Sequence, residues 1–200
     1  MDNYKQVTIA SYDQFASSFA QKFNNLTDLL RRSEFSCFLQ ALPGKRVLDV
    51  GCGAGDHALF FQQQGLQVTA IDLSSAMVRL ALQKGVDARV MDLENLLFPN
   101  NSFDGIWAVT SLLHVPKNSL PAVIKQLHAL LRERGVLYVC VKEGVGERMV
   151  VKDGEGDRFF AFWQREELLS LFENFERLVF REERVVLGNA VFLQFFFRKK

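Results

Sequence analysis

Three glycines stand on alternate positions directly after a short apolar run: Gly51, Gly53 and Gly55. A glycine adopts left-handed backbone angles without strain and has no Cβ, so a ligand can approach the backbone of such a loop closely. The helical pattern that begins near Asp56 would present unpaired N–H groups to the same ligand. This spacing predicts a loop that binds a ligand mainly through its backbone.

An acidic residue follows the next apolar run of the sequence. Asp72 ends the run that begins at Val68, about 20 residues beyond the glycine loop, where doubly wound sheets hydrogen-bond the hydroxyls of a ribose. The glycine loop and this acid together predict a site for an adenosine-like cofactor.

The cofactor that this loop predicts is not a dinucleotide. The dinucleotide fingerprint G-x-G-x-x-G places its third glycine where this chain has Asp56. A carboxylate at a helix start repels a pyrophosphate, whereas a cofactor with a sulfonium cation and an α-amino group tolerates Asp49 and Asp56 nearby. A nicotinamide enzyme on a similar sheet is therefore the weaker alternative.

The segment from Asp49 to Gly55 resembles motif I of the class I S-adenosylmethionine-dependent methyltransferases, which is an acid, any residue and then G-x-G-x-G. Where that family has a Pro-Gly-Gly turn, this chain has Glu133-Arg134-Gly135. Later motifs of the family are matched in the family's order by Asp72, Met91 to Leu93, Phe103 to Val109 and Leu130 to Val139.

The resemblance also implies which residues bind S-adenosylmethionine. Tyr12 belongs to a Tyr-Asp-x-x-Ala element with which many relatives cover the methionine end of the cofactor, although the same residues fit the face of an ordinary amphipathic helix. The implied cofactor-binding residues are Tyr12, Asp49, Gly51, Cys52, Gly53, Gly55, Asp72, Leu73, Met77, Asp92, Leu93 and Thr110.

The acceptor of the methyl group should lie beside the cofactor. Methyl transfer from a sulfonium is an in-line displacement, so the protein mainly aligns the reactants and excludes water, and a base is needed only where the acceptor loses a proton. His114 is our candidate for that base, and a structural hydrogen-bonding role is the alternative. The residues expected to line the acceptor pocket are Ser111, His114, Lys142, Glu143, Phe160 and Trp163.

The stretch from Glu143 to Arg158 carries four glycines among many charges and runs into an aromatic cluster that ends at Trp163. Such a stretch predicts a mobile lid over the pocket, and the alternative is a surface excursion whose aromatic side chains close the core. Lys142-Glu143-Gly144 and the later Phe-x-Trp sequence also resemble a subgroup of small methyltransferases of the type 11 or type 12 kind.

Apolar strands alternate with helical patterns along most of the chain, which predicts right-handed crossovers and a sheet covered on both faces. The expected fold is α/β: a doubly wound, seven-stranded, mostly parallel sheet with N-terminal helices and a C-terminal antiparallel hairpin whose turn is Gly188-Asn189. Expected strands span 46–50, 67–72, 88–91, 103–110, 136–142, 175–186 and 191–197, and expected helices span 11–24, 27–40, 56–64, 75–84, 120–134 and 164–172.

We expect one methyltransferase domain over residues 1–200. Its parts are a helical cap (1–44), a cofactor-binding core (45–142), the lid (143–163) and a helix with terminal strands (164–200).

The composition limits the partners of the chain. Its 24 basic and 23 acidic residues leave a net charge of +1, so no overall field favours nucleic acid or an anionic membrane. No apolar stretch approaches the ~20 residues that span a bilayer. Three widely spaced cysteines argue against a disulfide framework or a zinc site, so we expect no metal and a reducing cytoplasm.

The predicted function is transfer of a methyl group from S-adenosylmethionine to a small-molecule acceptor. A methyltransferase that acts on RNA or protein would need a larger basic or aromatic platform than Arg31-Arg32 and Lys45-Arg46 provide. A non-catalytic S-adenosylmethionine-binding protein is the other alternative. The sequence leaves open the acceptor, the methylated atom and the oligomeric state.

Overall fold

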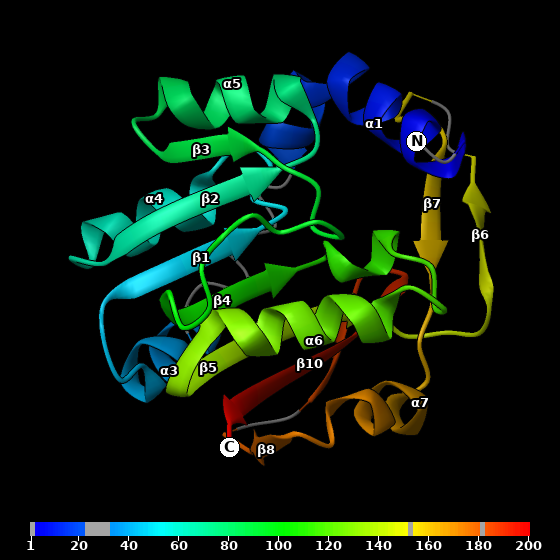
Figure 1. Ribbon diagram of the computed structural model, residues 1–200. Coiled ribbons are helices and arrows are strands. Elements are labelled where there is room, and N and C mark those ends of the chain that lie inside the picture. Colours follow the sequence, from blue (N-terminus) through cyan, green and yellow to red (C-terminus); the bar gives the residue numbers. More distant parts are fainter. Residues whose placement is uncertain (1–2, 23–32, 152–153, 181–182) are drawn as a thin grey trace.

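A computed structural model of the protein describes residues 3–22, 33–151, 154–180 and 183–200. The main strands are β1 (Arg46–Val50), β2 (Gln67–Asp72), β3 (Asp87–Val90), β4 (Phe103–Val109), β5 (Leu131–Lys142), β8 (Phe175–Leu178), β9 (Arg184–Leu187) and β10 (Ala190–Lys199). They form one eight-stranded sheet in the order β3-β2-β1-β4-β5-β10-β8, with β9 paired to β10 (Figure 1). Strands β1 to β5 are parallel, and β10 runs antiparallel to β5.

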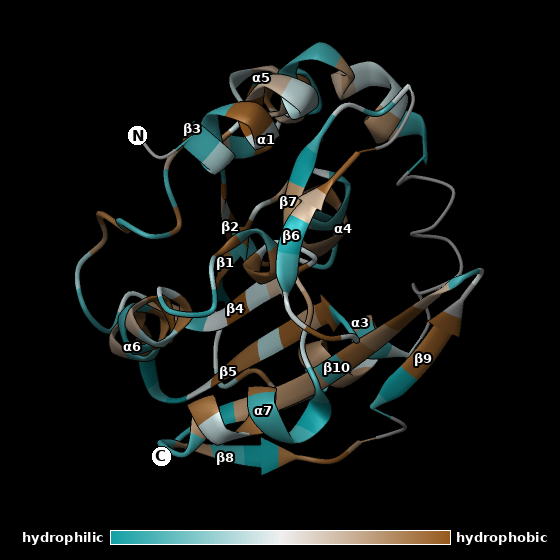
Figure 2. Ribbon diagram, turned by 90° about the vertical axis from the view of Figure 1, so that its right-hand side faces the viewer, coloured by the Kyte–Doolittle hydropathy of each residue, from teal (hydrophilic) through white to brown (hydrophobic). Residues whose placement is uncertain are grey.

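Helices cover both faces of this sheet. Because side chains alternate along a strand, Leu137, Val139 and Val141 of β5 enter one apolar core while Tyr138 and Cys140 enter the other. The first core is closed by α6 (Leu120–Leu130), α7 (Arg165–Leu169) and the 3₁₀ turn η2 (Ser170–Phe172), and the second by α3 (Glu34–Ala41), α4 (Asp56–Gln63) and α5 (Ser75–Gln83). The predicted doubly wound α/β fold is confirmed, although over the described residues its sheet has eight strands instead of the expected seven, because the run over 175–186 supplies two. Figure 2 shows the apolar colour of β5 and β10 inside the fold.

Two further elements stand beside the carboxyl ends of the parallel strands: the helix α1 (Asn3–Gln14) and a hairpin of β6 (Glu147–Val150) and β7 (Arg158–Ala161) (Figure 1). They are joined by two polar contacts. The hydroxyl of Ser11 donates to the carbonyl of Asp157 at 2.7 Å, and the amide of Phe159 donates to the hydroxyl of Thr8 at 3.0 Å. The segment expected to be a lid therefore contains a paired hairpin that is tied to α1.

The N-terminal helix differs from its prediction. It begins at Asn3 instead of Ser11, and residues 16–22 form a separate helical stretch after a turn at Phe15. Its buried residues are Thr8 and Ser11, so no apolar stripe marks the helix in the sequence and contacts with β7 hold it instead. Helix α3 falls within the second predicted helix, whose part over 27–32 lies outside the described residues.

Two predicted boundaries near the sheet were also wrong. Helix α6 ends at Leu130 because Leu131 pairs with Phe103 and already belongs to β5, and the turn is completed by Arg134 at φ 62°. The run expected as one strand over 175–186 forms β8 and β9, because the two pair with opposite halves of β10. The hairpin turn at Gly188-Asn189 is confirmed.

Candidate functional site

A cavity of about 640 Å³ opens at the carboxyl ends of β1, β2, β4 and β5, under α1 and β7. Parallel α/β sheets bind ligands at this edge, because loops from several strands converge there. The predicted site residues that line it are Tyr12, Asp49, Gly51, Cys52, Gly53, Asp72, Leu73, Met77, Asp92, Leu93, Thr110, Ser111, His114, Lys142 and Phe160.

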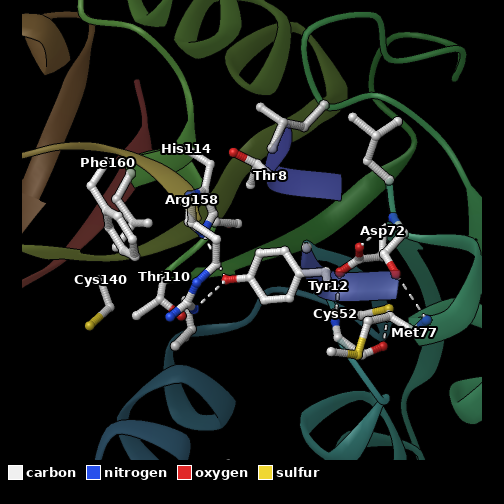
Figure 3. Close-up of a pocket in the computed structure, with 18 of the residues that line it drawn as sticks. Thr8, Tyr12, Cys52, Asp72, Met77, Thr110, His114, Cys140, Arg158 and Phe160 are labelled. Atoms are coloured by element: carbon white, nitrogen blue, oxygen red, sulfur yellow. Dashed lines mark hydrogen bonds between the residues drawn. The ribbon is translucent and has the colours of Figure 1, made fainter. Parts of the chain in front are cut away.

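Tyr12 lies between two differently built ends of this cavity, as Figure 3 shows. On one side are Cys52 of the glycine loop and Asp72, with Asp49 close enough to Asp72 for their charges to interact, and we call this the glycine end. On the other side are His114, Arg158 and Phe160, and we call this the hairpin end. Lys142, which lies against the Phe160 ring, and Gln194, which lies opposite Cys140 in the β5–β10 pair, belong to the hairpin end as well.

The three glycines of the loop have positive φ angles but different surroundings. A Cβ on Gly51 would lie 2.4 Å from that of Ser111, and a Cβ on Gly55 would lie 2.8 Å from that of Ala81. A Cβ on Gly53, where φ is 53°, would meet no atom within 4 Å. Gly53 therefore presents bare backbone to open cavity, whereas Gly55 lies outside the cavity lining and lets α4 pack on α5.

Asp72 joins the glycine loop to the start of α5. One of its carboxylate oxygens accepts a hydrogen bond from the amide of Gly53 at 2.9 Å, and the other accepts from the amide of Ser74 at 2.9 Å. Each oxygen retains a lone pair on the cavity side for a ligand hydroxyl. Burial raises the pKa of Asp72, while the backbone donors of Ser74 and Gly53 oppose that rise by binding the charged form.

Asp49 carries an unsatisfied acceptor at the floor of the glycine end. The residue is 2% exposed, and within the described part of the chain its Oδ2 has no hydrogen-bond partner. Burial, with the neighbouring charge of Asp72 as a second cause, raises the pKa of Asp49 to about 8. The backbone amide of Ala58 donates to the carboxyl group, but a buried oxygen without a donor is costly, so a cationic ligand group such as an ammonium would satisfy Oδ2.

Tyr12 and His114 meet across the cavity. The Tyr12 hydroxyl lies 2.9 Å from Nε2 of His114, and Nδ1 of His114 lies 2.6 Å from the carbonyl oxygen of Phe159. A carbonyl only accepts, so Nδ1 carries the proton and Nε2 accepts the Tyr12 O–H. Burial lowers the pKa of His114 to about 4, helped by the charges of Arg158 and Lys142, which keeps the ring neutral near pH 7.

Helix α1 is fixed over the glycine end by its own charged residues. A carboxylate oxygen of Asp13 accepts from the hydroxyl of Ser74 at 2.6 Å and from the amide of Ala76 at 3.0 Å, at the start of α5. The ammonium of Lys5 lies 2.8 Å from Asp92 and 2.9 Å from Glu94. These contacts hold α1 over the cavity as a roof. The ion pairs of Lys5 and the hydrogen bonds of Asp13 to the start of α5 fix its position along the cavity.

Two residues expected in the acceptor pocket lie elsewhere. Trp163 is 2% exposed and packs in the core closed by α6 and α7, because β7 turns its ring away from the cavity. Glu143 pairs with Arg184 at 2.7 Å on the far side of the hairpin base. Both expectations are corrected here, whereas Phe160 and Lys142 do reach the cavity.

The sequence reasoning missed several cavity residues, of which Lys5, Thr8, Arg158 and Gln194 contribute polar groups. Gln194 had a recognisable signal, since it is the polar residue inside the apolar run 191–197. Arg158 had none, because it is one charge among many in the glycine-rich stretch. Within the described residues, no three His, Cys, Asp or Glu side chains gather to hold a metal ion.

Comparisons with known proteins agree with this geometry. A family model described as a methyltransferase domain matches residues 47–135. A ubiquinone biosynthesis O-methyltransferase of Xanthomonas campestris is 41% identical over 106 residues, which are 50% of this chain and 44% of that protein. A phosphoethanolamine N-methyltransferase of Arabidopsis thaliana is 30% identical over 148 residues, which are 70% of this chain and 29% of that protein.

A solved structure shares the fold. The 1,6-didemethyltoxoflavin-N1-methyltransferase of Burkholderia thailandensis superposes with a TM-score of 0.67 at 24% identity, over 93% of this chain and 87% of that one. Over residues 47–135, a little under half of its length, the chain is similar to that methyltransferase domain, and its fold is the one that the solved structure shows. The chain spans less than half the length of the two curated relatives described above.

Over the part of the chain that the structure describes, no helix combines the length and the apolar character that a bilayer crossing needs.

Proposed function

We propose that this chain transfers a methyl group from S-adenosylmethionine to a small-molecule acceptor. The observation that supports the proposal best is the open space in front of Gly53, with the unsatisfied carboxyl oxygen of Asp49 and the carboxylate of Asp72 beside it. The names of the relatives point the same way, since they act on small molecules at oxygen or nitrogen.

The residues of the glycine end fit the parts of this cofactor. The ribose hydroxyls would donate to Asp72, and the ammonium of the methionine part would donate to Asp49. The backbone at Gly53 would lie against the sugar and the methionine part, with Asp92 and Leu93 beside the adenine. Bound there, the cofactor supplies an electrophilic methyl group on a sulfonium sulfur.

The protein's own part in the reaction is alignment and exclusion of water. Helix α1 and strand β7 close the cavity from above, and Tyr12 lies where the two ends meet. A group with a pKa near 4 is a weak base, so we do not assign His114 the role of a resident base. We propose instead that it orients the Tyr12 hydroxyl by accepting its hydrogen bond at Nε2.

Calorimetric titration with S-adenosylhomocysteine, the demethylated product, tests the cofactor assignment. We expect micromolar binding and none of NAD. Gly53→Val should weaken this binding by about 100-fold or more, because the new side chain would fill the space of the ligand. Tight binding of NAD without binding of S-adenosylhomocysteine would overturn the proposal.

Gly65→Val is the matched control for that variant. Gly65 also has a positive φ of 82° and open space around a Cβ, but it lies in the turn after α4, outside the cavity lining. Both substitutions carry similar backbone strain, so a difference between them measures intrusion on the ligand. Equal loss of binding in the two variants would show that strain, and not the cavity, explains the effect.

We also propose a cytoplasmic location and a small-molecule partner instead of a nucleic acid. The support is the near-neutral charge and three cysteines, Cys37, Cys52 and Cys140, that are free.

A further inference from the structure

The floor of the hairpin end is one face of the β5–β10 pair. In the antiparallel register Cys140 lies opposite Gln194, and Lys142 lies opposite Phe192. Directly opposed residues share a face, and so do residues two apart along a strand, so these four side chains point to the same side. All four line the cavity.

The roof over this floor is the inward face of β7. Arg158 and Phe160 are two residues apart on that strand and both line the cavity (Figure 3). The ammonium of Lys142 lies 4.4 Å from the centre of the Phe160 ring, and the guanidinium carbon of Arg158 lies 5.4 Å from it. The Phe160 ring therefore lies close to two cations, Lys142 from the floor and Arg158 from the roof.

Two buried donors at this end lack acceptors among the described residues. Arg158 is 7% exposed, and its Nε has no partner, although its other nitrogens lie 2.7 Å from Glu155 and 3.4 Å from the Tyr12 oxygen. Gln194 is 3% exposed; its carbonyl accepts from Tyr138 at 2.6 Å, which leaves its NH₂ group without a partner. Unsatisfied buried donors facing a cavity point to a ligand that brings acceptors.

The charge at this end has the matching sign. Glu155 offsets part of the Arg158 charge; burial is the main cause of the low pKa of His114, and the charges of Arg158 and Lys142 lower that pKa further. The glycine end is the reverse, since its unsatisfied group is the acidic oxygen of Asp49. The cavity is thus polarised, with acceptors at one end and donors and positive charge at the other.

We propose that the methyl acceptor is a small molecule with an anionic group, a carboxylate or a phosphate, which Lys142, Arg158 and Gln194 bind while Phe160 and Phe192 contact its apolar body. A carboxylate or phosphate supplies several acceptor lone pairs and a negative charge, so it can accept from both orphan donors and is attracted by the two cations. This inference rests on the proposed function, because it assigns the second substrate of the same cavity.

The test is binding of small anions to the protein saturated with S-adenosylhomocysteine. Benzoate, inorganic phosphate and the neutral analogue benzamide are titrated separately by calorimetry. We expect saturable binding of benzoate or phosphate, with benzamide weaker than benzoate by about 10-fold or more. Preference for one anion over the other distinguishes a carboxylate acceptor from a phosphate one.

The chain offers matched controls for both cations. Lys142→Met and Arg158→Met should each weaken anion binding about 10-fold. Lys117→Met and Arg148→Met should leave it unchanged, because these residues also stack on rings, those of Trp163 and Phe162, but lie outside the cavity. Arg158→Lys keeps the charge if Arg158→Met does not fold.

Three results would overturn the inference: no saturable binding of either anion, benzamide binding as tightly as benzoate, or equal anion affinity in Lys142→Met and Lys117→Met. Each of these results contradicts the inference when the same protein still binds S-adenosylhomocysteine. Loss of that binding in the unsubstituted protein would instead refute the proposed function, so the two failures are distinguishable.

Discussion

The polar groups of the glycine end come from one short stretch, from Asp49 to Ser74, in which the backbone amides of Gly53 and Ser74 hold the carboxylate of Asp72. Those of the hairpin end come from four separate elements, represented by His114, Lys142, Arg158 and Gln194, and they act through side chains. The glycine end therefore has the form of a local motif, whereas the hairpin end exists only after distant segments have packed together. Under the proposed function, such an arrangement would let the hairpin end differ from one acceptor to another without a change in the loop.

The largest expected effect concerns the stability of the hairpin end as the pH falls. The folded pKa of His114, about 4, lies below its ordinary value of 6.5, so its contribution to stability is present above pH 6.5 and is lost as pH falls through 4. The loss should be on the order of 3 kcal/mol for a pKa difference of this size. In urea unfolding measured at several pH values between 7 and 4, His114→Gln should reduce the fall of the unfolding free energy with pH. An unchanged dependence of that free energy on pH would contradict the burial argument.

The second largest effect is expected at the glycine end, where a substitution should weaken cofactor binding and leave anion binding at the hairpin end unchanged. Asp72→Ala should weaken S-adenosylhomocysteine binding by about 1–3 kcal/mol, because two ligand hydroxyls would lose their acceptor. Asp87→Ala removes a half-exposed carboxylate from β3 and serves as the control in the same calorimetric titration. The anion affinity of the hairpin end should stay within about 2-fold of the unsubstituted value. A large change there would mean that the two ends are not independent.

The opposite pattern is expected at the contact between the ends. Tyr12→Phe removes the hydroxyl that His114 orients, and it should slow methyl transfer by about 10-fold while S-adenosylhomocysteine affinity changes little. The measurement is release of S-adenosylhomocysteine with any acceptor that the protein methylates. If affinity falls as much as rate, Tyr12 belongs functionally to the glycine end.

The smallest effect is expected outside the cavity. Glu143→Gln breaks an exposed ion pair with Arg184, which should cost less than about 1 kcal/mol of unfolding free energy. Cofactor affinity and methyl transfer should be unchanged. A loss of transfer in this variant would restore Glu143 to the acceptor pocket from which the structure removes it.

The residues of the glycine loop show why one end was predictable. Gly51, Gly53 and Gly55 each require left-handed φ angles, and a backbone requirement of that kind is written directly in residue type and spacing. The strand β2 was predicted to the residue for a similar reason, since its apolar run ends in an acid. The sequence could not separate the roles of the three glycines, because the contacts of Gly51 with Ser111 and of Gly55 with Ala81 form only in the tertiary structure.

Trp163 shows the opposite case. An aromatic residue in a run such as 158–163 faces either a pocket or a core. Both cases give the same alternating pattern in the sequence, so the pattern does not distinguish them. The pairing of β6 with β7 decides it, because their register turns Arg158 and Phe160 inward and leaves Trp163 in the core beyond the strand. The start of α1 at Asn3 was mispredicted for a related reason, since the buried Thr8 and Ser11 of this helix are stabilised by Phe159 of β7 and by Asp157 just before it.

The sequence by itself determined the doubly wound sheet, the order of its motifs and the glycine end, because period, spacing and backbone angles are local properties of residue type. Only the tertiary structure decided the hairpin end. The tautomer of His114, the orphan donors of Arg158 and Gln194 and the position of Lys142 over Phe160 depend on distances between elements far apart in the chain. Packing fixes those distances, and no pattern within a single segment encodes them.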